Sequence, residues 1–190
     1  FGKKDEFSFL YNLIRFSSID STNLYTFDYY NDSLIIADSM KLIMSFASDS
    51  VDENVEFHLR YFPDNGDSVF NELTTNFTNF DRSIASSVIS SSIMASDSID
   101  SVTTQLRLNF LMDTAIINVF KDTSTISFNS SFLVELMNEN SSEFKLYSAN
   151  NLLNPPKLRV YYREFLSDSV VLDTSFHTYY SSQDVSVVDK

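Results

Sequence analysis

The stretch that decides the fold is Glu143–Arg163, with the sequence EFKLYSANNLLNPPKLRVYYR. Apolar residues alternate with polar ones over 144–147 and again over 158–163. Alternation with a period of two is typical of a β-strand that has one buried and one solvated face. Pro155 and Pro156 lack N–H donors, so they belong to the connection or to the first residue of a strand. The stretch therefore predicts two strands joined by a polar, proline-stiffened connection.

Similar strand patterns recur through most of the chain. They cover residues 7–16, 34–46, 55–61, 106–110, 126–128 and 132–137. The serine-rich segment 81–104 lacks a regular period, so we expect a surface loop with room for one short strand, whereas 112–121 has the spacing of a short helix. Strands at this density predict an all-β fold, an antiparallel β-sandwich of jelly-roll type with at most one short helix.

Length and composition fit one domain of this class. The 190 residues are 43% hydrophobic and include 18 Phe and 10 Tyr, which is enough for a core. The formal net charge of −13 argues against nucleic acids and anionic membrane surfaces as partners. No apolar run approaches the roughly 20 residues of a membrane span, so we expect no membrane insertion.

Several catalytic motifs are excluded by the composition. Cysteine is absent and the two glycines are Gly2 and Gly66, which excludes a thiolate nucleophile, a phosphate-binding glycine loop and a nucleophile elbow. His58 and His177 are the two histidines, and nothing in the pattern singles out a serine as their partner. We therefore expect a protein that is not an enzyme and needs no cofactor.

Two groups of residues are candidates for ligand binding. Calcium takes oxygen ligands from acidic loops, and the candidates are Asp49, Asp52, Glu53, Asp64 and Asp67. They do not match the spacing of an EF-hand, and aspartate is also a common turn residue. The candidates for stacking on a sugar ring are Tyr161, Tyr179 and Tyr180, although tyrosines also occupy half-buried strand positions with a solvated hydroxyl.

Four stretches in this order resemble the DNRLRE-type domain, a disaggregatase-related β-sandwich family that includes carbohydrate-binding modules. They are Asn12–Ser17 (NLIRFS), Ala37–Leu42 (ADSMKL), Phe70–Phe77 (FNELTTNF) and Phe144–Tyr162. The resemblance implies a sandwich with a structural or carbohydrate-binding role. Phe70 and Phe77 stand where the family has tryptophan, so this chain lacks the tryptophans on which a sugar-stacking platform would be built there.

The two ends depart from that resemblance. Such domains begin with a strand that this chain lacks, while its tail carries Val170, Leu172, Phe176, Tyr180, Val185 and Val187 and looks like that strand moved to the other terminus. We expect residues 1–168 to form the sandwich and 169–190 to fill the missing edge strand. Filling it in the same chain gives a closed monomer, and filling a neighbour's gap gives a head-to-tail filament by strand donation. A tandem array in a longer chain and a plain extension are the alternatives.

Together these patterns favour a non-catalytic, extracellular structural protein of the cell surface. It would be a subunit or repeat of a filament, sheath or adhesin, with other copies of the same chain as partners. The alternative is a carbohydrate-binding module of a secreted polysaccharide-active protein. An enzyme that uses His58 or His177 as general base is the third hypothesis.

Overall fold

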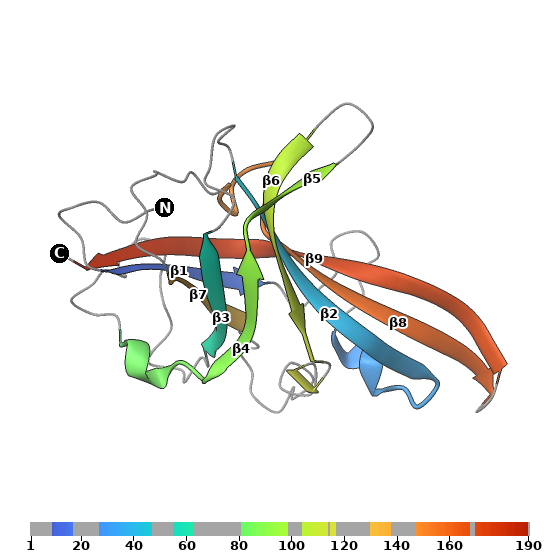
Figure 1. Cartoon of the computed structure of the whole chain (residues 1–190). Helices are drawn as coiled ribbons and strands as arrows, with labels where there is room; N and C mark the ends of the chain where they lie inside the picture. The colour runs from blue at the N-terminus through green and yellow to red at the C-terminus, as the bar shows by residue number, and fades with distance from the viewer. Residues whose placement is uncertain are drawn as a thin grey trace.

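The alternating patterns form antiparallel strands in the computed structural model, which describes residues 9–16, 27–46, 55–62, 81–98, 104–113, 115–116, 130–137, 147–167 and 170–189. The strands are β1 (Phe9–Phe16), β2 (Ile35–Ser45), β3 (Glu56–Phe62), β4 (Val88–Ile93), β5 (Ala95–Ser98), β6 (Thr104–Met112), β7 (Ser130–Leu136), β8 (Lys157–Ser167) and β9 (Val170–Asp189). Two short 3-10 turns, η1 (Phe27–Asn31) and η2 (Arg82–Ile84), accompany them. In these ranges the strands make one sheet in the order β4-β3-β7-β1-β9-β8-β2-β6-β5 (Figure 1). The expected all-β antiparallel class is confirmed.

Strand β9 joins the two halves of this sheet. Its first half pairs with β8 from Val170 to Tyr180, and its second half pairs with β1 from Ser181 to Asp189. One half-sheet therefore contains β4, β3, β7 and β1, and the other contains β8, β2, β6 and β5. The tail lies in the middle of the sheet of its own chain, so the expected edge position is wrong: β9 has a paired neighbour on each side.

The two half-sheets enclose a common core. Its fully buried side chains include Ile14, Phe57, Leu59, Phe132 and Val134 from one half and Met40, Leu42, Leu108, Phe110, Leu158 and Val160 from the other. The far ends of the sheet also meet. The Oγ of Ser92 on β4 accepts a hydrogen bond from the backbone N–H of Asn109 on β6 at 3.0 Å, and the Oγ of Ser90 donates to the carbonyl of Leu111 at 2.7 Å. The sheet is thus nearly closed around the core, and each half-sheet has one side that faces the core and one that faces outward.

The serine-rich segment differs from its prediction. In place of a loop with one short strand, residues 81–98 contain η2, β4 and β5. Strand β4 pairs with β3, and β5 pairs with the outer edge of β6. None of the six side chains of β4 is fully buried, so its residues carry no clean apolar alternation.

Other predictions fall partly outside the described residues. The expected strand at 126–128 and the first strand of the deciding stretch, up to residue 146, lie there. Of the expected helix 112–121, Met112 ends β6 and the described residues 115–116 are helical. Pro155 and Pro156 directly precede β8, as predicted. No helix in the described part of the chain has the length and apolar character to cross a membrane.

The β8–β9 hairpin projects from the rest of the molecule (Figure 1). Strand β2 accompanies β8 as far as the pair Ile35 and Glu164, and the backbone N–H of Phe165 bonds to the carbonyl of Leu34 at 2.8 Å. Beyond that point, residues 166–167 and 170–172 form the end of the hairpin. We call these residues the arm tip.

Candidate functional site: the outward face of β2, β8 and β9

Residues of β8 alternate between the core and the outside, because a strand presents successive side chains on opposite faces. Leu158, Val160 and Tyr162 are buried. The residues between them, Lys157, Arg159, Tyr161 and Arg163, are partly exposed and point outward.

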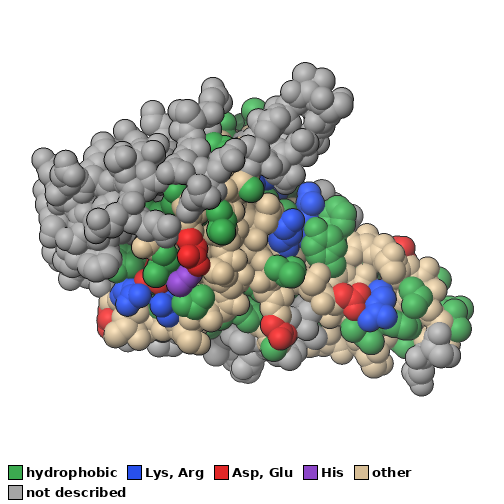
Figure 2. Space-filling view, viewed as in Figure 1, with side chains coloured by type: hydrophobic (Ala, Val, Ile, Leu, Met, Phe, Trp, Pro, Cys, Tyr) green, Lys and Arg blue, Asp and Glu red, His purple; other side chains and the backbone are tan. Residues whose placement is uncertain are grey.

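Strand pairing brings more basic and aromatic side chains onto the same face. Lys41 of β2 lies opposite Arg159, Tyr180 of β9 opposite Lys157, and Phe176 of β9 opposite Tyr161. We call this surface the basic–aromatic face, and it consists of Lys41, Arg107, Lys157, Arg159, Tyr161, Arg163, Phe176 and Tyr180. In Figure 2, Lys and Arg side chains lie beside hydrophobic ones on the part of the molecule that holds these strands.

The basic–aromatic face concentrates positive charge on an acidic chain. It holds five of the 13 Lys and Arg residues, against 26 Asp and Glu in the whole sequence. Arg163 forms an ion pair with Asp38 through two hydrogen bonds, 2.8 Å from Nε to Oδ2 and 2.6 Å from Nη2 to Oδ1. These bonds raise the pKa of Arg163. Lys41, Lys157 and Arg159 make no ion pair with any described residue. Among the residues that the structure describes, these three cations therefore have no counter-charge of their own.

Aromatic rings hold these cationic groups in place. The guanidinium of Arg159 lies 4.7 Å from the ring centroid of Phe176, and the Nζ of Lys157 lies 5.7 Å from that of Tyr180. Burial lowers the pKa of Lys157, and the charges of Arg107 and Arg159 lower it further. Neighbouring cations repel one another, and an anion bound between them would reduce that repulsion.

A hollow adjoins the cations at the Tyr161 end of the face. It has a volume of about 240 Å³ and is lined by Asp38, Tyr161, Tyr162, Thr174, Ser175 and Phe176. The rings of Tyr161 and Phe176 are 5.6 Å apart and form part of its wall. Rings, hydroxyls and cations together are suited to a ligand with an apolar flat side and an anionic group.

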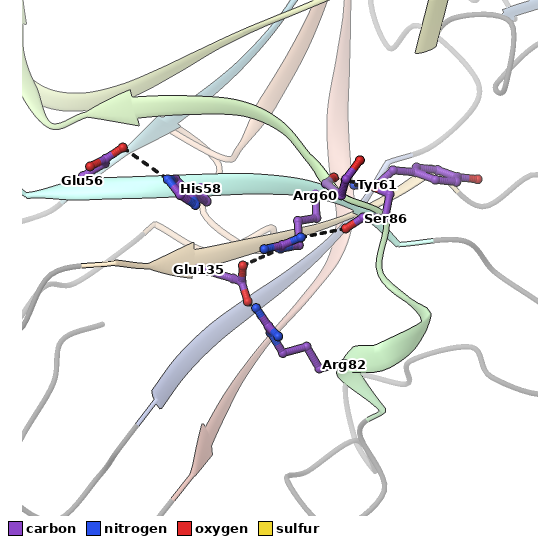
Figure 3. Close-up of polar contacts among 8 residues, drawn as sticks. Glu56, His58, Arg60, Tyr61, Arg82, Ser86 and Glu135 are labelled. Carbon is purple, nitrogen blue, oxygen red and sulfur yellow. Dashed lines mark hydrogen bonds and ion pairs between the residues drawn. The ribbon is translucent and has the colours of Figure 1, made fainter.

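A second polar cluster lies on the outward side of β3 and β7 (Figure 3). Glu135, only 3% exposed, accepts hydrogen bonds from the Nε of Arg60 at 2.6 Å and from the Nε of Arg82. Burial alone would raise the pKa of Glu135, but the hydrogen bonds and charges of Arg82 and Arg60 outweigh it and hold that pKa below its usual value. Arg60 also donates to the carbonyl of Ser86 at 2.9 Å. These bonds tie η2 and the following segment to the sheet, and so the cluster is structural.

The two histidines occupy different settings. His58 shares an outward face with Glu56, at 3.2 Å from its Nε2 to the carboxylate, as the alternation of β3 predicted. His177 is 1% exposed, and its Nδ1 lies 2.8 Å from the hydroxyl of Tyr30. That hydroxyl is 3.2 Å from the hydroxyl of Tyr179. His177 thus belongs to a buried polar cluster of the core, away from any surface ligand.

The structure separates the three tyrosines that the sequence proposed for sugar stacking. Tyr161 and Tyr180 lie on the basic–aromatic face. Tyr179 is fully buried and stacks on Phe27 at 4.2 Å between centroids, so its ring is not available to a sugar. That part of the prediction is wrong because Tyr179 faces the core side of β9.

The predicted donor-strand residues do not fill the core as expected. Val170, Leu172 and Phe176 are 50%, 57% and 45% exposed, and Tyr180 is partly exposed on the outward face. The core side of this part of β9 instead carries His177 and Tyr179. The backbones of the remaining two, Val185 and Val187, pair with β1, and the structure does not describe their side chains.

The candidate calcium ligands Asp49, Asp52, Glu53, Asp64 and Asp67 all lie outside the described residues. Within the described ranges, no three His, Cys, Asp or Glu side chains come together as a metal site would require. The basic residues of the basic–aromatic face were not among the predicted site residues. The local signal for them was the alternation of cations and rings in KLRVYYR, at Lys157–Arg163.

Comparison with protein-family models, with curated proteins and with solved structures found no match. The resemblance to the DNRLRE-type domain therefore stays a prediction.

Proposed function

We propose that the chain is a non-catalytic structural subunit that binds further copies of itself in an extracellular filament, sheath or adhesin. The observation that carries this proposal is the apolar arm tip. Leu166, Val170, Val171 and Leu172 are between 47% and 66% exposed at the end of a projecting hairpin. Clustered apolar side chains that remain exposed on a folded chain are typical of protein interfaces.

The position of β9 supports assembly by strand exchange. One continuous strand completes both half-sheets, with Tyr180 paired to β8 and Ser181 paired to β1. Its second half makes the same backbone bonds whether the β1 partner belongs to its own chain or to a neighbour. Exchange of identical elements is a low-cost route from a closed monomer to an oligomer.

A cysteine pair distinguishes these two arrangements. Arg15 and Gln183 are opposite each other on β1 and β9, with 2.8 Å between their side-chain nitrogen and oxygen. Opposed residues of antiparallel strands have the Cα spacing that a disulfide needs, and the chain has no cysteine of its own. We expect Arg15→Cys with Gln183→Cys, oxidised in the assembled state, to give a covalent ladder on a non-reducing gel.

The matched control is Arg163→Cys with Thr174→Cys. These residues are opposite each other inside the β8–β9 hairpin, so their disulfide stays within one chain under either arrangement. A ladder from the first pair alone supports exchange. Disulfides within single chains from both pairs, in material that light scattering shows to be assembled, would disprove exchange and leave docking of the arm tip. A monomer at every concentration would disprove self-assembly itself.

The basic–aromatic face favours a second candidate function, that of a carbohydrate-binding module. The rings of Tyr161 and Phe176 beside the 240 Å³ hollow are the observation that supports it. Such a module is retained by polysaccharides in affinity gels, and Tyr161→Ala should reduce that retention. Equal migration of the protein in gels with and without polysaccharide would count against this function.

A further inference from the structure

From the basic–aromatic face we infer that the polysaccharide ligand is acidic: a linear glycan whose carboxylates bind Lys157, Arg159 and Lys41 while its sugar rings stack on Tyr161 and Phe176. This inference rests on the second candidate function and names its ligand class. A neutral glycan would use the rings and hydroxyls of the face but would leave the three cations without a role.

The first argument is the set of cations that have no ion-pair partner in the described part of the chain. Arg159 is partly exposed, and the contact of its guanidinium among the described residues is the ring of Phe176, 4.7 Å away. A carboxylate of the ligand would give this guanidinium a charge-assisted hydrogen bond. Lys157 keeps its ammonium beside Arg107 and Arg159 although burial and these neighbours disfavour the charge. An anion bound between them would offset the repulsion among these cations.

The spacing of the cations is the second argument. Alternate residues of a strand are about 7 Å apart, so the outward residues from Lys157 to Arg163 span about 20 Å. Lys41 widens this row at Arg159, and Phe176 and Tyr180 border it on β9. Its cations without an ion-pair partner among the described residues lie at the Lys157 end, and Tyr161 and Phe176 follow toward Arg163. A row of this length, with cations at one end and rings beyond them, suits an extended glycan more than a single small anion.

The net charge of −13 does not prevent this binding. At physiological ionic strength the Debye length is about 8 Å, so acidic groups elsewhere on the surface are largely screened at the face. Asp38, the acidic group in the wall of the hollow, is already paired with Arg163. Nucleic acid is the less favourable polyanion, because its recognition calls for a broad basic surface and a basic domain.

Affinity electrophoresis with chemically matched polymers tests the inference. The probes are polygalacturonate, the same polymer fully methyl-esterified, and single-stranded DNA. We expect retention by polygalacturonate that weakens by about tenfold or more on esterification, because each carboxylate loses its charge-assisted bonds. Added salt should weaken the same retention, since the cations of the face are at the surface.

Two substitutions with the same change of charge locate the site. Arg159→Gln should lower the affinity for polygalacturonate about tenfold, whereas Arg15→Gln, on β1 of the other half-sheet, should leave it unchanged. Lys157→Gln should also lower the affinity while leaving the thermal stability equal or higher, because it removes a disfavoured charge. A merely structural role for Lys157 predicts the opposite change in stability.

The possible outcomes separate the acidic-ligand inference from the carbohydrate-binding function. Equal retention by the acid and by its ester overturns the acidic ligand and leaves a carbohydrate-binding module. No retention by either polymer overturns both. Tighter binding of DNA than of polygalacturonate also overturns the inference and makes nucleic acid the ligand.

Discussion

Removal of the C-terminal strand should unfold the protein, because β9 lies in the middle of the sheet. It pairs with ten residues of β8 and with eight of β1. An antiparallel ladder has about one backbone hydrogen bond per pair, each with a net contribution of about 0.5–1.5 kcal/mol, so the loss amounts to about 9–27 kcal/mol. Buried Tyr179 and His177 are lost as well. Because domains are stable by only about 5–15 kcal/mol, residues 1–167 alone should not fold.

The assay for this prediction is thermal unfolding of residues 1–167, followed by circular dichroism, with and without a peptide of residues 168–190. We expect no cooperative transition for the truncated chain and a restored transition when the peptide is in excess. Restoration shows directly that a separate molecule can provide β9, which strand donation requires. A truncated chain that unfolds cooperatively within a few degrees of the intact protein would refute the reasoning.

Three single substitutions test other parts of the structure. Glu135→Gln breaks a buried ion pair and should lower the free energy of unfolding by about 3 kcal/mol, or the midpoint temperature by about 6–12 °C. Folding lowers the pKa of Glu135. The stability that its carboxylate contributes is therefore present above the usual glutamate pKa of about 4.3 and is lost as the pH falls through the lower folded value. Tyr30→Phe removes the hydroxyl that bonds the buried Nδ1 of His177 and should cost about 1–3 kcal/mol in chemical denaturation. Lys157→Met should raise the stability at neutral pH, by less than about 1 kcal/mol because the group is partly exposed and solvent screens its charge. Since the pKa of Lys157 is lowered on folding, this advantage should shrink as the pH rises through the folded pKa toward about 10.4.

The sequence alone predicted the strands that have one buried and one solvated side. Residues 55–61 and 158–163 alternate cleanly because each lies against the core on one face only. The same principle explains the failure at β4, where both faces are partly exposed and no period appears. Apolar and polar residues alternate along a strand only where one of its faces is buried, so a strand with two exposed faces shows little alternation.

The orientation of β9 could not be predicted from alternation. Apolar or aromatic residues occur on both of its faces, as Phe176 and Tyr180 on one and Tyr179 on the other illustrate. The partner decides which face is buried: Tyr179 stacks on Phe27 of η1, a contact between segments about 150 residues apart. Local patterns contain no information on such a partner.

The basic–aromatic face could not be predicted from the sequence for a similar reason. Its row on β8 is visible in KLRVYYR, but Lys41 and Arg107 stand at least 50 positions earlier in the chain, on β2 and β6. Register alone places Lys41 opposite Arg159. A chain with a net charge of −13 therefore has a local cationic surface that its composition does not indicate.

The two proposed activities use different parts of one hairpin. The cations of β8 end at Arg163, opposite Thr174, and the apolar arm tip begins with Leu166 and Leu172, farther from the core. Contacts at the tip therefore leave the basic row open to solvent, and a ligand on the basic row leaves the tip free. The exposed hydrophobic side chains are one feature, and the mutually repelling cations that lack a counter-charge within the described ranges are another. Each is unfavourable in an isolated monomer. A subunit that joins its neighbours through the tip and holds an acidic glycan along the row satisfies both.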